Sequence, residues 1–320
     1  MRHTILKCFA GCLLATLIFL SPAWGQTVTG SITGLVTDPS GAVVPGAKVT
    51  AENTATAVKT VAQTNGSGVY TIRFLPSGTY TMTVAAKGFS TENIAAFPVE
   101  IAQTVKINVA LRIASVTRVE VTARAHPILN TTNATLGNTL TTTEIANFPL
   151  NGRNFSSLTM FEPGAIATDP TGMTGNNAIE RNTYNNGIAS IDGNRQQAND
   201  YVLEGADDNE PQNNLIAYNP APDAIAEVRV ISSNGNATYG NTNGGTVVTV
   251  LKSGGNQYHG SLYGFLENYR LDANTWGDNL NGSPKPHYTQ TIFGGTFGGP
   301  IKRNRLFFFG DYEGIRRNFA

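Results

Sequence analysis

Cysteine is almost absent from this sequence, and its scarcity narrows the possible chemistry. The 320 residues include two cysteines, Cys8 and Cys12, and both lie close to the N-terminus. The rest of the chain has no thiol that could form a disulfide, attack a substrate or bind a metal ion. A chain of this length can depend on side-chain packing instead, because it is long enough to bury a sizeable core.

Charge and histidine are also scarce. Charged residues make up 14% of the chain and the formal net charge is +0, which argues against nucleic acid as a partner, because phosphates require a basic surface. His3, His126, His259 and His287 stand far apart, without a paired-histidine metal motif or a phosphate-binding loop. We therefore predict no catalytic residues, no metal site, no cofactor and no enzymatic activity.

Long apolar runs are limited to the N-terminus. Cys8–Leu20 is apolar, but it is shorter than the roughly 20 residues that a transmembrane helix needs. A positively charged start precedes it and small residues follow at Ala23 and Gly25, so we predict that residues 1–25 are a secretory signal peptide. Lipid attachment at Cys12 is a weaker alternative, because too little apolar chain precedes that residue.

The abundant residues favour a β-rich fold. Glycine contributes 34 residues, and threonine and asparagine are frequent, which favours strands and turns over helices. No later segment is apolar enough for a membrane-spanning helix, so any insertion into a membrane has to use β-strands. We expect a mainly β protein.

Residues 26–113 alternate apolar and polar side chains in short segments separated by turn signals. Turns are indicated at Asp38–Gly41, Asn65–Gly68 and Pro76–Gly78. About seven strands at this spacing predict an antiparallel, immunoglobulin-like β-sandwich. The apolar positions of the alternation are Ala47, Val49, Ala51, Tyr70, Ile72, Phe74, Tyr80, Met82, Val84, Val105, Ile107, Val109 and Leu111.

The motifs of this segment resemble the carboxypeptidase regulatory-like domain. The resemblance rests on Gly34–Asp38, Val44–Val49, Thr64–Tyr70 and Leu75–Tyr80. It implies no peptidase activity. Two roles stay open for the domain, a structural or docking role and carbohydrate binding. The first is favoured, because the sequence has no cluster of tryptophans that would form a sugar-binding platform.

Residues 114–124 are expected to form a linker with a β-prone, extended segment. Such a segment can add as a strand to the edge of a partner's sheet through main-chain hydrogen bonds. It resembles the TonB box of TonB-dependent outer-membrane receptors, which implies contact with TonB of the inner-membrane energising complex. The alternative is that it begins the first strand of the next domain. The residues of the segment are Val119, Glu120, Val121, Thr122 and Ala123.

The stretch Ile225–Asn256 predicts a strand, glycine-rich turns and a second strand over Thr246–Leu251. The order of its residues resembles the end of the plug domain of TonB-dependent receptors, although Leu251 stands where that family usually has threonine. A hairpin of some other β-rich protein is the alternative. The resemblance implies a plug–barrel junction at Tyr239, Gly240, Gly244, Gly245 and Lys252.

The whole of residues 125–255 follows the plug pattern, which implies a mixed α/β domain. Thr141–Pro149 predicts a short capped helix that ends at proline. The phrase Phe148–Phe155, followed by Pro163 and Gly164, is typical of the Oar-like branch of these receptors.

Four acidic residues of the predicted plug lie close together in the sequence and form a candidate loop for a ligand or a cation. Hard cations such as calcium take carboxylate oxygens as ligands, but the spacing is not that of an EF-hand. A solvated loop facing a pore is the favoured alternative. The four residues are Glu204, Asp207, Asp208 and Glu210.

Residues 256–320 predict three long strands that are rich in aromatic residues and glycine, at Tyr258–Arg270, Tyr288–Ile301 and Leu306–Gly314. Alternation along such strands is typical of outer-membrane barrels. In the third strand, one face carries Leu306, Phe308 and Tyr312, and the other carries Phe307, Phe309, Asp311 and Glu313. Phe297–Ile301 and the residues that follow it also resemble the Oar-like family.

Three strands are too few to close a barrel, so we expect a fragment of a longer protein, with a truncated gene product as the alternative. The resemblances together imply the N-terminal part of an Oar-like TonB-dependent receptor that takes up an unknown nutrient ligand. They imply an outer-membrane location, barrel contact with lipid and a periplasmic β-sandwich. The alternative is a secreted carbohydrate-binding or adhesive β-sandwich protein.

Overall fold

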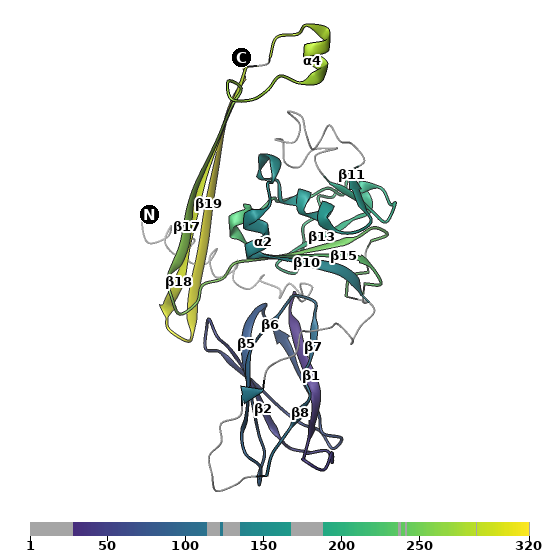
Figure 1. Cartoon of the computed structure of the whole chain (residues 1–320), viewed down its shortest axis with the longest axis vertical. Helices are drawn as coiled ribbons and strands as arrows, with labels where there is room; N and C mark the ends of the chain where they lie inside the picture. Colours follow the sequence, from purple (N-terminus) through teal and green to yellow (C-terminus); the bar gives the residue numbers. More distant parts are fainter. Residues whose placement is uncertain are drawn as a thin grey trace, which may run out of the picture.

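The computed structural model describes residues 28–113, 122–123, 135–167, 188–235, 238–240, 242–285 and 287–319. The predicted signal peptide and Val119–Val121 lie outside the described residues. The described part is mainly β, as the sequence predicted (Figure 1). No helix within these ranges is long and apolar enough to cross a membrane.

The first unit is a β-sandwich of two sheets, drawn in purple and blue in Figure 1. One sheet has the order β4-β1-β7, with β8 also paired to β1, and the other has the order β3-β2-β5-β6-β9. The strands of the first sheet are β1 (Gly30–Thr37), β4 (Val69–Leu75), β7 (Thr104–Lys106) and β8 (Val109–Ala110). Those of the second are β2 (Lys48–Asn53), β3 (Lys59–Gln63), β5 (Gly78–Ala85), β6 (Glu92–Val99) and β9 (Thr122–Ala123).

The alternation in the sequence identified most of the sandwich core, but it failed at the end of β4. Phe74 is 68% exposed and has a φ of 59°, whereas Leu75 is 1% exposed. The ladder between β1 and β4 shifts its register between Gly30 and Ile32, opposite this point. The irregularity gives the buried position to Leu75, so Phe74 is not part of the core.

A second sheet follows in the chain and has the order β10-β15-β16-β13-β14. Its central pair, β15 and β16, is antiparallel, and β16 pairs with β13 in parallel, so the sheet is mixed. We call it the mixed sheet. Its strands are β10 (Leu136–Thr141), β13 (Asp200–Leu203), β14 (Ala206–Asp207), β15 (Ile225–Ser233) and β16 (Thr246–Leu251).

Both faces of the mixed sheet are covered. Short helices cover one face, where Val228 and Val230 pack with Ile145 of α2 and Leu158 of η2. The other face meets the sandwich, so Arg229 is only 4% exposed, although the alternation predicted a strand with two different faces. The helices are α2 (Thr142–Asn147), η1 (Asn151–Arg153), η2 (Phe155–Phe161), η4 (Gln196–Ala198) and η5 (Pro222–Ala224). A two-stranded sheet of β11 (Ala165–Ala167) and β12 (Ala189–Ile191) lies beside η2.

The predicted capped helix is present as α2. Its N-cap is Thr141, whose backbone N–H donates to Glu144 Oε2 at 2.8 Å, and both bonds of a capping box are present. The helix ends at Asn147, immediately before Phe148 and Pro149. Proline cannot continue a helix, which explains the short length.

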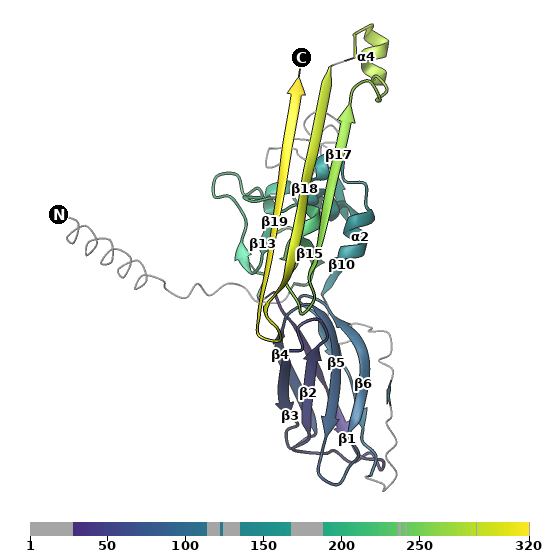
Figure 2. The ribbon, with the colours of Figure 1, turned by 90° about the vertical axis from the view of Figure 1, so that its left-hand side faces the viewer.

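Three long strands complete the described chain and form an antiparallel meander, drawn in yellow and green, which runs alongside the mixed-sheet unit and ends near the sandwich (Figures 1 and 2). They are β17 (His259–Asn268), β18 (Tyr288–Lys302) and β19 (Leu306–Phe319). The connection between β17 and β18 contains α4 (Trp276–Asn281) and lies at the end of the sheet far from the sandwich. The short turn between β18 and β19 lies at the end near the sandwich.

The irregular end of β4 provides a test of the sandwich core. Leu75→Ala should lower the free energy of unfolding of the sandwich by about 2–5 kcal/mol, because it leaves a cavity in the core. Phe74→Ala should change it by less than about 0.5 kcal/mol, because that ring is exposed. Hydrogen exchange of the β1 and β4 amides across a urea series measures both values. Equal losses in the two variants would contradict the assignment of the core.

Candidate functional site

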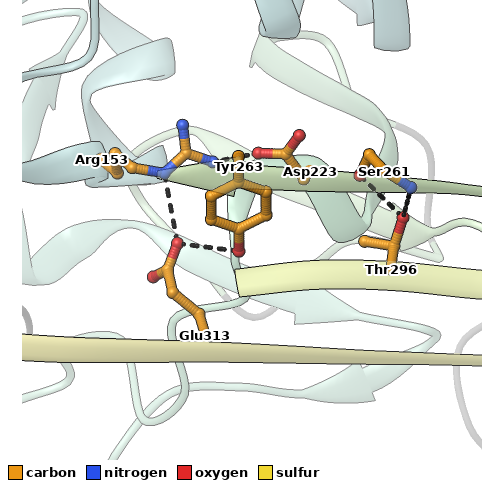
Figure 3. Close-up of polar contacts among 6 residues, drawn as sticks. All are labelled: Arg153, Asp223, Ser261, Tyr263, Thr296 and Glu313. Carbon is orange, nitrogen blue, oxygen red and sulfur yellow. Dashed lines mark hydrogen bonds and ion pairs between the residues drawn. The ribbon is translucent and has the colours of Figure 1, made fainter. Parts of the chain in front are cut away.

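The candidate site lies where the mixed sheet and its helices meet the three long strands. Its centre is Arg153, the last residue of η1. Gly152 and Arg153 have φ values of 61° and 53°, and two successive residues in the left-handed region make a sharp turn. The turn directs the Arg153 side chain towards β17 and β19 (Figure 3).

Two carboxylates hold the Arg153 guanidinium. Its Nε donates to Glu313 Oε2 on β19 at 3.2 Å, and one terminal nitrogen donates to Asp223 Oδ2 on η5. The side chains of Arg153 and Glu313 are 14% and 7% exposed. An ion pair buried to this degree is costly to break, because removing one partner leaves the other charge without compensation.

Aromatic side chains of β17 complete the surroundings of this cation. The Cζ atom of Arg153 lies 4.6 Å from the ring centroid of Tyr263 and 4.5 Å from that of Phe265. Both distances suit a cation–π interaction. Tyr263 also donates its hydroxyl hydrogen to Glu313 Oε2 at 3.1 Å (Figure 3). One carboxylate therefore accepts hydrogen bonds from the arginine and from the tyrosine.

Gly294 on β18 makes the tyrosine contact possible. In the sheet register it pairs with Tyr263 on one side and with Glu313 on the other. A Cβ at Gly294 would lie 2.5 Å from the Tyr263 hydroxyl and 2.3 Å from the Tyr312 carbonyl oxygen. Only glycine leaves the space in which the Tyr263 ring crosses the middle strand to reach Glu313.

A cavity of about 520 Å³ adjoins the cluster. Its lining combines apolar and charged side chains from α2, η1, the end of β16 and the strands β17 and β18. Representative lining residues are Ile145, Leu150, Arg153, Lys252, Phe265 and Gln290. The mixed-sheet unit and the long strands thus meet through the contacts of Arg153, and the cavity lies beside these contacts.

Two parts of the chain match known domain families. Residues 31–112 match the carboxypeptidase regulatory-like domain, and residues 250–320 match an outer membrane beta barrel domain. Along most of its length the chain is also 27% identical to the TonB-dependent transporter Oar of Myxococcus xanthus, in an alignment of 318 residues that covers 93% of this chain. The resemblance to Oar-like TonB-dependent receptors is confirmed. The chain spans 28% of the length of that curated relative.

Solved structures give only distant likenesses. The siderophore receptor PirA from Acinetobacter baumannii is 19% identical, with 55% of this chain and 24% of that chain covered and a TM-score of 0.39. The Bacillus anthracis TIE protein is 18% identical, with 27% and 17% covered and a TM-score of 0.23. TM-scores this low carry no argument about the fold. The barrel-domain match and the Oar relative support an outer-membrane location.

The predicted junction residues lie in different places. Lys252 lines the cavity beside Arg153, and burial lowers its pKa while Asp223 acts in the opposite direction. Tyr239 instead packs with Ile101 on the sandwich side of the mixed sheet. A Cβ at Gly244 or Gly245 would lie 2.5 Å from Asn199 or Ile191 respectively, so both glycines serve packing within the mixed-sheet unit. Gly240, directly after Tyr239, is exposed.

The four acidic residues do not converge on one point. Asp207 accepts a hydrogen bond from the Asn209 amide at 2.9 Å, and Asp208 accepts one from the Tyr218 amide at 3.0 Å. Glu204 accepts from the Leu251 amide, and Glu210 accepts from the amides of Gln212 and Asn213. Asp207 and Glu210 thus close local turns, whereas Asp208 and Glu204 bind backbone amides 10 and 47 positions away. Among the described residues, no group of three or more His, Cys, Asp or Glu side chains is arranged to hold a metal ion.

Only part of the TonB-box-like segment is described. Thr122 and Ala123 form β9, which pairs in parallel with Asn93 and Ile94 of β6 in the sandwich. The two residues thus add to the edge of the chain's own sandwich, whereas the sequence predicted addition to a partner's sheet or the first strand of the next domain.

A second polar contact joins the sandwich to the mixed sheet at Ile101, just after β6. The Ile101 amide donates to Glu227 Oε2 at 3.1 Å, and its carbonyl oxygen accepts from Arg229 at 3.2 Å. Burial raises the pKa of Glu227 to about 7, and the hydrogen bond from Ile101 opposes the shift, whereas Glu100 adds to it. Arg229 also opposes the increase.

Sequence reasoning did not identify Ile101 or the residues around Arg153 as functional. Arg153 lies within the phrase that marked the Oar-like branch, so the motif pointed to its neighbourhood without a role. Asp223, Tyr263 and Glu313 are brought to it by three separate elements. No local pattern signals such a meeting of distant residues.

The space that Gly294 leaves for the Tyr263 ring gives a test of the Arg153 cluster. Gly294→Ala should displace the Tyr263 ring and weaken the attachment of the mixed-sheet unit by about 1–3 kcal/mol, because the new methyl group overlaps the hydroxyl. Gly264→Ala is the matched control, because a Cβ at Gly264 would meet nothing within 4 Å. The urea concentration at which residues 135–255 become protease-sensitive in the full-length protein measures the effect. Equal midpoints for both variants would contradict the role of Gly294.

The carboxyl of Glu227 predicts a pH dependence of the contact at Ile101. The pKa of Glu227 is raised while the sandwich is docked on the mixed sheet. The docked state therefore binds more protons than the undocked state between about pH 4.5 and 7. Docking should therefore weaken by up to about 3 kcal/mol as the pH rises through this window, and stay constant above it. Protection of the Ile101 amide against hydrogen exchange, corrected for the intrinsic rate, measures this. Glu227→Gln should remove the dependence, and an unchanged slope would refute the assignment.

Proposed function

We propose that this chain is the N-terminal part of a TonB-dependent outer-membrane receptor that takes up a nutrient ligand. In this proposal residues 125–255 form the plug, residues 256–320 form the first strands of the barrel, and residues 114–124 form the linker. The carrying observation is the buried attachment of Arg153 to Glu313 and Tyr263, because it joins the mixed-sheet unit to one face of the long strands.

The two faces of the three-stranded sheet support the assignment as barrel wall. The face towards the mixed sheet carries polar groups such as Gln290, Thr296 and Glu313, which make hydrogen bonds there. The opposite face is apolar and exposed. This division suits a barrel strand with lipid outside and a plug inside. The exposed apolar residues of the opposite face include Leu262, Leu266, Phe293, Phe297, Ile301 and Tyr312.

The position of the sandwich supports a periplasmic orientation. Asn256 bonds to Ala55 of the sandwich and to Asn304 of the short turn between β18 and β19. Outer-membrane barrels have short periplasmic turns and longer extracellular loops. The longer connection with α4 lies at the far end of the strands, which suits the outer side of the membrane. Residues 1–25 would direct export to this location.

Transport in this proposal depends on TonB, which binds residues 119–123 and pulls on the linker. The TonB-dependent Oar relative supports this partner at the level of the family. The protein acts as a receptor rather than an enzyme and requires no cofactor. The ligand is a nutrient of unassigned chemistry, and Glu204, Asp207, Asp208 and Glu210 remain candidates for its loop.

Deletion of residues 119–123 from the full-length receptor tests the proposal. Uptake of its ligand should fall to the level of a strain without TonB, while folding, outer-membrane insertion and ligand binding stay unchanged, because the deleted segment contributes only the two-residue edge strand β9 to the sandwich. A deletion of equal length in the connection that contains α4 is the control for chain shortening. Undiminished uptake without residues 119–123 would reject the role of the segment.

A further inference from the structure

The sandwich contacts the mixed sheet around one fully buried side chain, Ile101, beside which Val28 and Ala102 are partly buried. Ile101 follows β6 directly and is 0% exposed, although it lies in a turn at the end of the sandwich. It packs on the side of the mixed sheet opposite to the short helices. The residues packed with it are Val202, Ile231, Tyr239 and Val248. We call this contact the Ile101 seat.

The Ile101 seat is linked by hydrogen bonds to an edge strand of the mixed sheet. Arg229 on β15 donates to the Ile101 carbonyl oxygen at 3.2 Å and to Thr139 Oγ1 on β10 at 3.4 Å. One guanidinium therefore joins the sandwich to β10, which is an outermost strand of the sheet. While the seat is occupied, this link opposes separation of β10 from β15.

A pull on the linker acts at the same place. Residue 123 is followed by 11 residues before Thr135, after which β10 begins, so tension reaches the plug at this edge strand. The linker strand β9 pairs with β6, and β6 ends at Val99, two positions before Ile101. Both paths of force converge on the contact between Ile101, β15 and β10.

A second point of contact fixes the sandwich beneath the long strands. The Asn256 amide donates to the Ala55 carbonyl oxygen at 2.9 Å. A Cβ built on Gly255 would lie 3.6 Å from the Ala55 Cβ. The sandwich therefore touches the plug at Ile101 and touches the chain between the plug and the first long strand at Ala55.

We propose that the sandwich is a releasable clamp, which holds β10 on β15 through the Ile101 seat and must leave the seat before the plug can be remodelled for transport. This inference rests on the proposed function as a TonB-dependent receptor. The partner of the plug surface formed by Val202, Ile231 and Val248 is thus the chain's own sandwich.

The composition of the seat suits release. On the sandwich side it depends on Ile101, the partly buried Val28 and Ala102, and a few hydrogen bonds, and small domain contacts of this kind separate readily. Arg229 Nε is buried without a hydrogen-bond partner among the described residues, which lowers the stability of the seated state. The 11 residues from 124 to 134 can extend to roughly 36–40 Å while β9 stays paired in the sandwich, so separation requires no unfolding of either unit.

The test uses a disulfide across the second contact in the full-length receptor. Ala55→Cys with Gly255→Cys places two Cβ atoms at a separation that a disulfide accommodates. The chain has no other cysteine between residue 13 and residue 320. Oxidation should lock the sandwich in place and reduce ligand uptake at least tenfold, with full recovery on reduction. The two single-cysteine variants should transport at the normal rate under both conditions.

A second measurement needs no transport. In purified receptor the cysteine pair should oxidise rapidly and almost completely, and Ile101→Asp in the same background should slow disulfide formation at least tenfold, because the charged side chain cannot occupy the seat. Slow oxidation of the pair without Ile101→Asp would overturn the docked position. Uptake at the normal rate by the oxidised receptor would overturn the requirement for release.

These outcomes separate the clamp from the proposed function. If the reduced receptor takes up ligand independently of TonB, the proposed function fails, whereas the oxidation rates still decide whether the sandwich is docked through Ile101. If uptake depends on TonB but its rate is the same in the oxidised and the reduced receptor, the receptor function stands and the clamp is rejected.

Discussion

The burial of one guanidinium between two units of the chain is the constraint on which the arrangement depends. Arg153 is taken out of water by η1 and held by carboxylates from η5 and β19, with two aromatic rings of β17 beside it. Such a charge is stable only while its partners are in place. The contact therefore specifies how the mixed-sheet unit sits against the long strands more than it adds to net stability.

The same constraint explains local features that would otherwise be unrelated. The left-handed turn at Gly152 and Arg153 directs the cation outward, and Gly294 leaves room for Tyr263 to reach Glu313. The sandwich repeats the principle at Ile101, where a buried apolar side chain is accompanied by Glu227 and Arg229. In both contacts charged side chains position one unit against the next.

Much of the fold was predictable because it depends on local periodicity. Alternation of apolar and polar residues identified most of the sandwich strands, and the capping residues marked α2. The alternation in β19 was imperfect, and the strand runs to Phe319 rather than to the predicted end at Gly314. Phe74 shows the limit of that reasoning, because a change in strand register exchanges it with Leu75 in the core. Arg229 shows another limit, because a polar residue of an alternating strand is buried when a second unit covers its face.

The sequence by itself determined the β-rich composition, the order of the units and the resemblance to Oar-like receptors, since these follow from residue types and their spacing along the chain. Only the tertiary structure decided which residues meet. Arg153 and Glu313 are 160 positions apart, and Ile101 and Glu227 are 126 apart. Contacts over such distances depend on how separate sheets pack against one another, which no local pattern of residues encodes.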